Sequence, residues 1–389
     1  MFLVFLKLGV TSFGGPIAHL GYFREELIAK RRWLREGQYA ELIALCQFLP
    51  GPASSQVGFS LGLARAGYRG AIAAWLAFTL PSAVLMTAFA FGATLLDGSA
   101  GSGAISGLKA VAVAVVAHAV WGMAKTLTPD LRRILIGIAA AAAALLLAGV
   151  LGQLLAIAIG VGGGLLLCRA AASGIDDEPA LPIRVSRRAG IVCLGVLCAL
   201  LLMLPALNAL LSSPGVATAD AFSRAGALVF GGGHVVLPLL QAEPAVAHAV
   251  SPGQFLAGYG AAQAVPGPLF TFAAYLGAAM VPGPAGIANA ALALVAVFLP
   301  GILLVLGALP FWNALRRRTL ARAAVRGVNA AVVGILAAAL YRPVITSGVT
   351  DVGQLLIACG CLALLFLRAP AWVAVLLGAG AGILIGVFA

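Results

Sequence analysis

Long apolar runs without charge are the feature that most restricts what this chain can fold into. Ile134 to Val150 and Gln354 to Leu367 contain no charged residue, and several such runs approach the roughly 20 residues that span a bilayer. Because hydrocarbon offers no hydrogen-bond partners, each run must satisfy its backbone groups as a helix. Only 9% of the residues are charged, against about 25% in a soluble domain. The sequence therefore predicts an all-α polytopic membrane protein.

The net charge of +12 does not indicate nucleic-acid binding. The basic residues lie in short loops between apolar runs, without interleaved aromatic residues, and are typical of the positive-inside topology signal. The six cysteines form no CxxC pair and lie mostly inside apolar runs, where cysteine is a small hydrophobic residue. We therefore expect no metal, no cofactor and no nucleic-acid partner.

The chain contains two diverged copies of one unit, at an offset of about 217 residues. The matching landmarks are Phe5–Gly9 with Phe222–Gly226, Phe13-Gly14-Gly15 with Phe230-Gly231-Gly232, Gln38 with Gln254, Gln47 with Gln263, Pro50-Gly51-Pro52 with Pro266-Gly267-Pro268, Leu80-Pro81 with Leu299-Pro300, and Lys109 with Arg326. Their order is the same in both copies. We predict domains at 1–170 and 216–389, with a cytoplasmic loop and a linking transmembrane helix at 171–215.

Loop charges predict that the two copies have opposite orientations. The loop after the first FGG segment is basic (Arg24 to Arg35), whereas its counterpart, Gln241 to Ser251, has no Lys or Arg. Later the bias reverses, because Asp97 to Gly107 lacks basic residues and its counterpart contains Arg316 to Arg318. This pattern indicates an inverted-topology repeat, in which two halves share a site near the midplane.

Glycine and proline interrupt the FGG and PGP segments, where a continuous helix is disfavoured. If these segments crossed the membrane fully, many Lys and Arg residues would lie outside; re-entrant hairpins place them inside and leave Arg342 as the main exception. We therefore predict four re-entrant hairpins and about nine full spans. The hairpins are expected near 5–22, 38–64, 222–240 and 255–281, and the spans near 70–96, 109–127, 134–150, 152–168, 190–211, 287–309, 327–341, 352–367 and 371–388.

The backbone breaks are the strongest candidates for an anion site. A helix N-terminus has unpaired N–H groups and about half a positive charge, and glycine allows close approach of the backbone. The alternative is that glycine and proline only kink packed helices. The predicted substrate-binding residues are Lys7, Ser12, Gly14, Gly15, His19, Gln47, Gly51, Ser54, Ser55, Gln56, Arg224, Gly231, Gly232, His234, Gln263, Gly267 and Thr271.

Several of these candidates also have a structural interpretation. Lys7 and Arg224 lie at equivalent positions in apolar stretches, where charge is costly and often functional, but either could instead extend to an interface. His19 and His234 could bind the anion, take part in proton coupling, or serve in packing. The acids flank the apolar runs, which disfavours a cation as cargo. No cluster of nucleophile, base and metal ligands indicates an enzyme.

These motifs carry a family resemblance. Phe5 to His19 (FxKLGxxSFGGPxAH), Leu45 to Gln56 (LCQxLPGPxxxQ) and Leu80-Pro81-Ser82 resemble the chromate ion transporter family in its long, two-domain form. The second copy departs from the pattern, because Gly233 replaces a proline and Val236 stands in the place of His19. The likeness covers nearly the whole chain.

The resemblance implies a multi-pass protein of the bacterial inner membrane that exports chromate, driven by membrane potential or protons, and gives chromate resistance. Its partners would be a small oxyanion and the lipid bilayer, and a homodimer is left open. Chromate and sulfate share charge and shape, so a sulfate or other oxyanion carrier is the alternative. An anion channel is a further one.

Overall fold

In the computed structural model the chain is helical, and the description covers residues 1–93, 98–147, 149–169, 181–183, 185–211, 213–230, 233–315 and 317–388. Seven helical segments in this part are long and apolar enough to cross a membrane. They are Ala53–Ala93 (α4), Gly98–Leu127 (α5), Val150–Leu167 (α7), Arg187–Leu211 (α8), Ala285–Leu315 (α14 with the short turns after it), Thr319–Gly348 (α16 with the turns after it) and Ala371–Phe388 (α19). The predicted all-α membrane fold is confirmed.

Two shorter helices, α6 (Leu131–Leu146) and α18 (Val352–Phe366), pack beside long ones. Three predicted boundaries were wrong. The segments α5, α9 (Pro214–Leu228) and α16 (Thr319–Ala339) begin earlier in the sequence than expected. Lys109 and Arg326 therefore lie inside helices and do not begin spans. Each helix begins upstream of them, in glycine- or alanine-rich sequence that packs against a neighbouring helix.

The first FGG segment is a hairpin of two half-length helices. Helix α1 (Phe2–Thr11) has ten residues, or about 15 Å of length, half of a bilayer core. After the break, α2 (Gly15–Phe23) turns back, so that the rings of Phe5 and Phe23 lie 5.9 Å apart, and both helices pack against α4. The matching pair in the second copy is α9 with α10 (Val236–Gln241), which pack against each other.

The PGP segments form the other two hairpins. Helix α3 (Glu36–Phe48) packs against the start of α4, whose first part ends at a sharp corner where Gly67 has a φ of 62°. Beyond this corner α4 continues as a full span. In the second copy α12 (Pro252–Ala262) packs against α13 (Phe272–Met280), and the Tyr275 hydroxyl donates to the Gln254 carbonyl at 2.9 Å. These contacts favour the re-entrant interpretation over full crossing.

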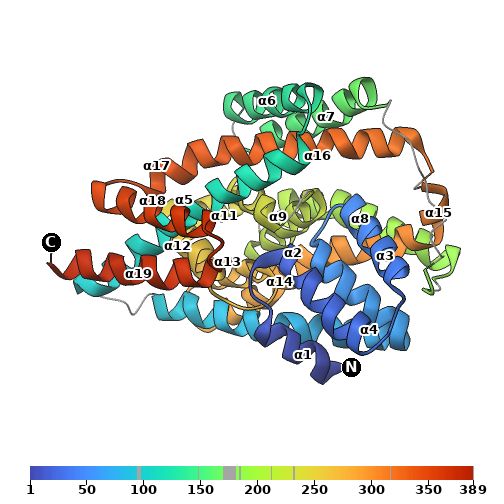
Figure 1. Cartoon of the computed structure of the whole chain (residues 1–389), viewed down its shortest axis with the longest axis horizontal. Coiled ribbons are helices and arrows are strands. Elements are labelled where there is room, and N and C mark those ends of the chain that lie inside the picture. Colours follow the sequence, from blue (N-terminus) through green and yellow to red (C-terminus); the bar gives the residue numbers. More distant parts are fainter. Residues whose placement is uncertain are drawn as a thin grey trace.

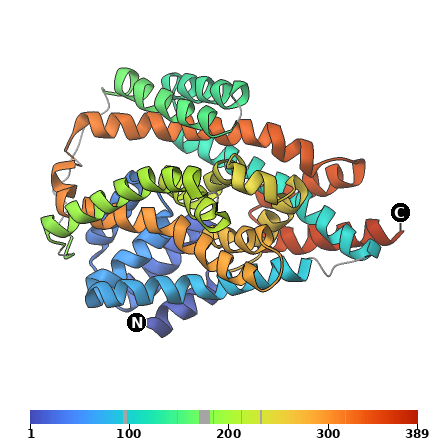
Figure 2. The ribbon, with the colours of Figure 1, turned by 180° about the vertical axis from the view of Figure 1, so that it is seen from behind.

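The two copies exchange their scaffold helices. Helix α5 of the first copy packs along α18 and α19 of the second, and α16 of the second packs along α6 and α7 of the first (Figure 1). The view from behind shows the same two groups of helices (Figure 2). A methyl group on Gly107 would collide with the Gly378 backbone, and one on Gly327 with that of Gly160. Small residues thus allow close helix contact, as is typical in membranes.

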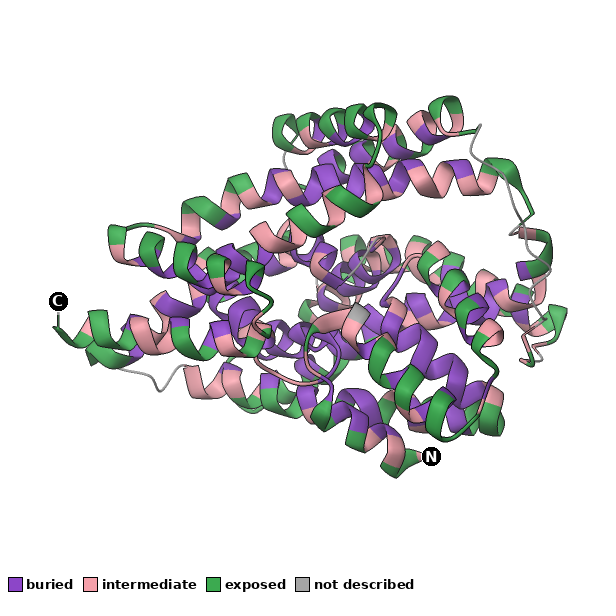
Figure 3. Ribbon diagram, in the orientation of Figure 1, coloured by how far each residue is buried: buried purple, intermediate pink, exposed green. Residues whose placement is uncertain are grey.

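Burial separates a central bundle from outer helices (Figure 3). Large apolar side chains on α8 are exposed, among them Leu202 at 74% and Leu210 at 80%. Exposed apolar surface of this extent on long helices is the surface expected to face lipid. The second-copy hairpins and the facing parts of α4 and α14 are mostly buried, and in the first copy Ser12, His19 and Gly51 are buried, so these groups near the breaks lie inside the protein.

Candidate functional site

Backbone hydrogen bonds join the breaks of one copy to those of the other. The Gly51 N–H donates to the Val229 carbonyl oxygen at 2.7 Å, and the Gly267 N–H donates to the Ser12 carbonyl oxygen at 2.9 Å. Gly51 and Gly267 are equivalent by sequence, as are Ser12 and Val229. Each PGP break is therefore bonded to the residue that precedes the FGG segment of the opposite copy, and the four residues joined in this way are all buried.

Glycine is required at both PGP breaks. Gly51 has a φ of 124° and Gly267 one of 102°, values that side-chain-bearing residues rarely adopt. A Cβ on Gly51 would lie 2.6 Å from Gln56 Nε2 and 3.0 Å from Gly301 Cα. A Cβ on Gly267 would lie 2.8 Å from Ser82 Oγ. The two breaks therefore depend on both the conformation and the small size of glycine.

In each hairpin the second helical segment begins at the break. Helix α2 starts after Gly14, which has a φ of 98°, and α4 starts directly after Pro50-Gly51-Pro52. In the second copy short 3₁₀ turns, Gly233–Val235 and Leu269–Thr271, lead into α10 and α13. The first N–H groups of a helix have no partner within it and carry a partial positive charge. The convergence of such segment starts favours binding of an anion.

Polar side chains of the first copy gather around its breaks. His19 is 1% exposed, and its Nδ1 lies 3.4 Å from Ser54 Oγ. Among the described residues, buried atoms without a hydrogen-bond partner include Ser12 Oγ, His19 Nε2, Ser55 Oγ, Ser60 Oγ and Thr79 Oγ1. Since buried polar atoms are normally paired, this group of atoms has unused capacity to bind a polar ligand.

Ser60 and Thr79 were not among the predicted site residues. Both are buried in α4, on opposite sides of its corner, and Thr79 follows Phe78, whose ring lies 5.3 Å from that of His19. The signal available in the sequence was a polar residue inside an apolar stretch. It was weak, because hydroxyl groups in membrane helices often bond only to their own backbone.

The second copy lacks this polar lining. By the alignment of the two copies, apolar residues stand at the positions of Ser12, His19, Ser54, Ser60 and Thr79; they are Val229, Val236, Phe270, Leu276 and Phe298. Two of its own polar side chains pair with each other, since His234 Nδ1 lies 2.6 Å from the Tyr259 hydroxyl, which also interacts with Gln263. Among the described residues, the buried hydroxyls without a partner therefore belong to the first copy.

Gln56 and Thr271 are already bonded to the backbone of the breaks. Gln56 Nε2 donates to the carbonyl oxygens of Pro50 at 2.9 Å and Gly301 at 3.0 Å. Thr271 Oγ1 donates to the Pro268 carbonyl oxygen at 2.8 Å. These contacts hold the breaks in shape, and they leave the Gln56 amide with no free donor for an anion.

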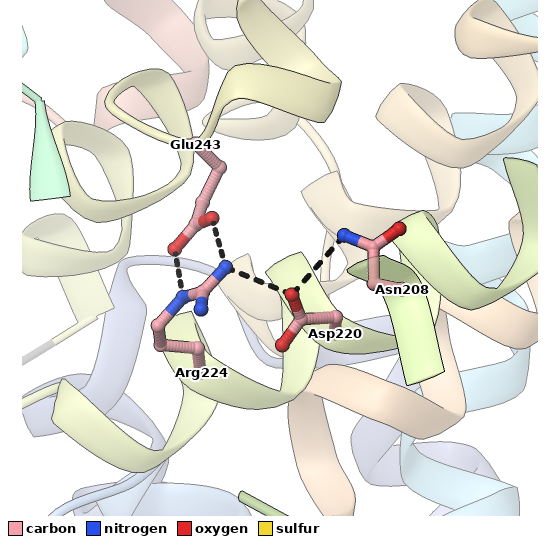
Figure 4. A network of polar contacts seen from close by, with 4 residues as sticks. All are labelled: Asn208, Asp220, Arg224 and Glu243. Carbon is pink, nitrogen blue, oxygen red and sulfur yellow. Dashed lines mark hydrogen bonds and ion pairs between the residues drawn. The ribbon is translucent and has the colours of Figure 1, made fainter. Parts of the chain in front are cut away.

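Lys7 and Arg224 form ion pairs. Lys7 Nζ lies 3.9 Å from the Glu26 carboxylate, and Arg224 binds Glu243 through two hydrogen bonds of 2.9 Å. Glu26 and Glu243 are themselves equivalent in the two copies. Arg224 also donates to Asp220 at 3.1 Å, and Asn208 extends the network (Figure 4).

The geometry thus assigns both cations a role in holding the returning chain of each FGG hairpin. The side chain of Lys7 is 66% exposed and that of Arg224 27% exposed. Contact of either cation with substrate stays a prediction, and these pairings do not favour it.

The remaining candidates differ in their surroundings. Gln47 is exposed, whereas Gln263 is half-buried with its Nε2 unpartnered. Gly14 and Gly15 lie at the first break, with φ values of 98° and 78°. Gly231 and Gly232 lie outside the described residues.

Comparison with known proteins identifies the family to which the chain belongs. The sequence model described as "Chromate transporter" matches residues 1–167 and again 216–383. The chain belongs to the chromate transporter family. Membership supports a role as a membrane transporter and implies an oxyanion substrate.

Curated relatives of this family resemble the chain over most of its length. It is 28% identical to a probable chromate transport protein of Synechococcus elongatus, over 86% of this chain and 82% of the relative. It is 29% identical to a chromate transport protein of Pseudomonas aeruginosa, over 87% and 79%. An uncharacterized transporter of Methanocaldococcus jannaschii is 25% identical over 88% and 83%. No solved structure matches the chain.

Proposed function

We propose that this transporter carries chromate out of the cytoplasm across the bacterial inner membrane, and so gives chromate resistance. The substrate would bind where the four breaks meet, against the polar groups of the first copy. The observation that carries this proposal is the buried cluster of unpartnered atoms, Ser12 Oγ, His19 Nε2 and Ser55 Oγ among them, beside two broken helix starts.

Such a site suits a doubly charged tetrahedral anion. Chromate loses its water shell on entering the protein, and the lost hydrogen bonds must be replaced by donors. Hydroxyl groups, an imidazole N–H and backbone N–H groups are all donors, and hydrogen bonds to a charged partner are worth about 1.5–3 kcal/mol each. No fixed cation is needed, which is consistent with the ion pairing of Lys7 and Arg224.

We also propose that the two copies have opposite orientations, so that the base of each hairpin in one copy faces the other side of the membrane from the base of the equivalent hairpin in the second copy. The reciprocal hydrogen bonds of Gly51 and Gly267 support this arrangement, because each copy supplies the other with the same contact. Related halves of this kind can alternate access to a shared site. The energy would come from the membrane potential or from protons.

Sulfate or another oxyanion is the second candidate substrate, because a site made of hydroxyl and amide donors distinguishes poorly between tetrahedral dianions. An anion channel is the alternative mechanism. A channel would conduct only down the electrochemical gradient, whereas a carrier saturates and can move substrate uphill.

Transport by purified protein in liposomes tests the proposal. We expect saturable chromate flux that accumulates against its concentration gradient when a membrane potential or pH gradient is imposed, with sulfate as a competitor. His19→Val, which installs the residue type of the second copy, should lower this flux; Val236→Ala is the matched control. Absence of chromate flux from correctly folded protein would refute the substrate, and purely downhill, non-saturating flux would favour the channel.

A further inference from the structure

A cavity of about 380 Å³ lies between one hairpin of the second copy and scaffold helices of both copies. Its walls come from the α6–α7 turn, from α10, and from the end of α16 with the turn Leu340–Ile345. The polar or charged side chains that line it are those of Gln153, Gln241 and Arg342.

Arg342 is the charged residue of this lining. It stands at an interruption of the helix, where its φ of −146° and ψ of 113° are extended, and it is exposed. In the described part of the chain no carboxylate lies within salt-bridge distance of its guanidinium, and Glu243, the residue after Ala242 of the lining, is already bound by Arg224. The cavity therefore holds a positive charge that no neighbouring acid neutralises.

The topology makes this charge unusual. Arg342 is the main exception when the other basic residues are placed on the cytoplasmic side, and it lies beside the base of the second FGG hairpin, whose loop from Gln241 to Ser251 has no Lys or Arg. A cation kept on the outer side works against the positive-inside signal. Its position in a cavity indicates a role other than setting the topology of the chain.

The cavity also lies close to the candidate site. Helix α10 starts three residues after Gly233, which is packed against Pro16 at the breaks. Gln241 lies about 12 Å from Gly233 along this segment. Gln153 Nε2 and the Pro238 carbonyl are hydrogen-bonded across the cavity wall, and Gln241 Oε1 is buried without a partner. Because amide oxygen and nitrogen are assigned by their contacts, Gln241 can turn a donor toward an anion.

We propose that this cavity is the outer vestibule of the transport pathway, in which Arg342 and Gln241 transiently hold a tetrahedral dianion between the central site and the outside. The proposal rests on the function proposed above. Arginine suits this task because its planar donors match an oxyanion in two-point contact. The exposure of Arg342 keeps the interaction weak, as release of a substrate requires.

Charge-selective labelling tests the vestibule without depending on transport. Ala242, which lines the cavity, is replaced by cysteine in a full-length chain whose six native cysteines are changed to alanine. Anionic and cationic methanethiosulfonate reagents are then applied to the outside of intact cells. At about 7 Å in water-like surroundings one unit charge changes a reagent's local concentration roughly two- to threefold, and oppositely for the two reagents.

With Arg342 present we expect the anionic reagent to be favoured, and Arg342→Gln should lower the anionic-to-cationic rate ratio about fivefold. Arg342→Lys should keep most of the preference. Arg368→Gln, at the exposed α18–α19 turn, is the matched control and should leave the ratio unchanged. If the glutamine variant does not fold, 0.5 M salt should bring the anionic-to-cationic rate ratio close to one in the chain that retains Arg342.

Three outcomes would overturn the vestibule: no labelling of Ala242→Cys from outside, a ratio insensitive to Arg342, or a ratio insensitive to salt. Failure of the proposed function looks different, because the labelling pattern would stand while purified protein moved no chromate. Where transport is present, Arg342→Gln should raise the half-saturating chromate concentration on the outer side about fivefold, with the maximal rate nearly unchanged.

Discussion

Replacing Gly51 by alanine should destabilise the protein by about 3 kcal/mol. The left-handed backbone at Gly51, with a φ of 124°, costs a residue with a Cβ about 1–2 kcal/mol. The new methyl group would also stand 2.6 Å from Gln56 Nε2, which donates to two carbonyl oxygens. Displacing that amide forfeits two hydrogen bonds worth about 1 kcal/mol each.

The free energy of unfolding can be measured by steric trapping of the purified protein in bicelles. Gly92→Ala is the matched control, because no heavy atom lies within 4 Å of its ideal Cβ and its φ is ordinary; this change should be neutral or slightly stabilising. Gly267→Ala should resemble Gly51→Ala, given its φ of 102°. If Gly51→Ala and Gly92→Ala unfold with free energies within about 0.5 kcal/mol of each other, the account of the break is refuted.

Three further predictions concern the site, the ion pairs and the topology. His19→Val should lower the rate of chromate uptake into liposomes at least about tenfold, the loss of one hydrogen bond to a charged ligand, and a drop no larger than that of Val236→Ala would contradict the site. Glu243→Gln should lower the free energy of unfolding by about 2 kcal/mol, because it removes one of the two carboxylates that bind the partly buried Arg224 and leaves only Asp220. Glu26→Gln should cost less than about 1 kcal/mol, because its partners Lys7 and Arg31 are 66% and 43% exposed; equal losses would mean that burial does not distinguish the pairs. Single cysteines at Lys30 and Pro244 should react with impermeant reagents from opposite sides of the membrane, and reaction from the same side would rule out opposite orientations.

Membrane insertion and the hairpin interruptions could be predicted from local sequence. Uncharged runs such as 134–150 are too apolar for any soluble fold, and Pro50-Gly51-Pro52 disfavours a continuous helix wherever it occurs. The repeat was visible because landmarks such as Gly51 and Gly267 keep their order. These features depend on residue type and spacing, and both are present in the sequence itself.

The pairing of Lys7 and Arg224 with acids could not be predicted in the same way. Glu26 and Glu243 lie 19 residues beyond their partners in the chain, and only the return of the hairpin brings each acid to its cation. Ser60 and Thr79 were missed for a similar reason, since the corner at Gly67 separates them and places Phe78, next to Thr79, against His19. Such contacts depend on the direction that the chain takes after a break.

The sequence by itself determined that the chain is a helical membrane protein with two copies of one unit and four backbone breaks, because hydrophobicity and backbone restriction act locally. Only the tertiary structure decided that the breaks of one copy bond to those of the other, through the Gly51–Val229 and Gly267–Ser12 contacts. It also decided that, among the described residues, the buried hydroxyl groups without a hydrogen-bond partner belong to the first copy. The hydrogen bonds depend on which segments meet across well over a hundred residues of chain, and local sequence preferences do not determine contacts at that separation.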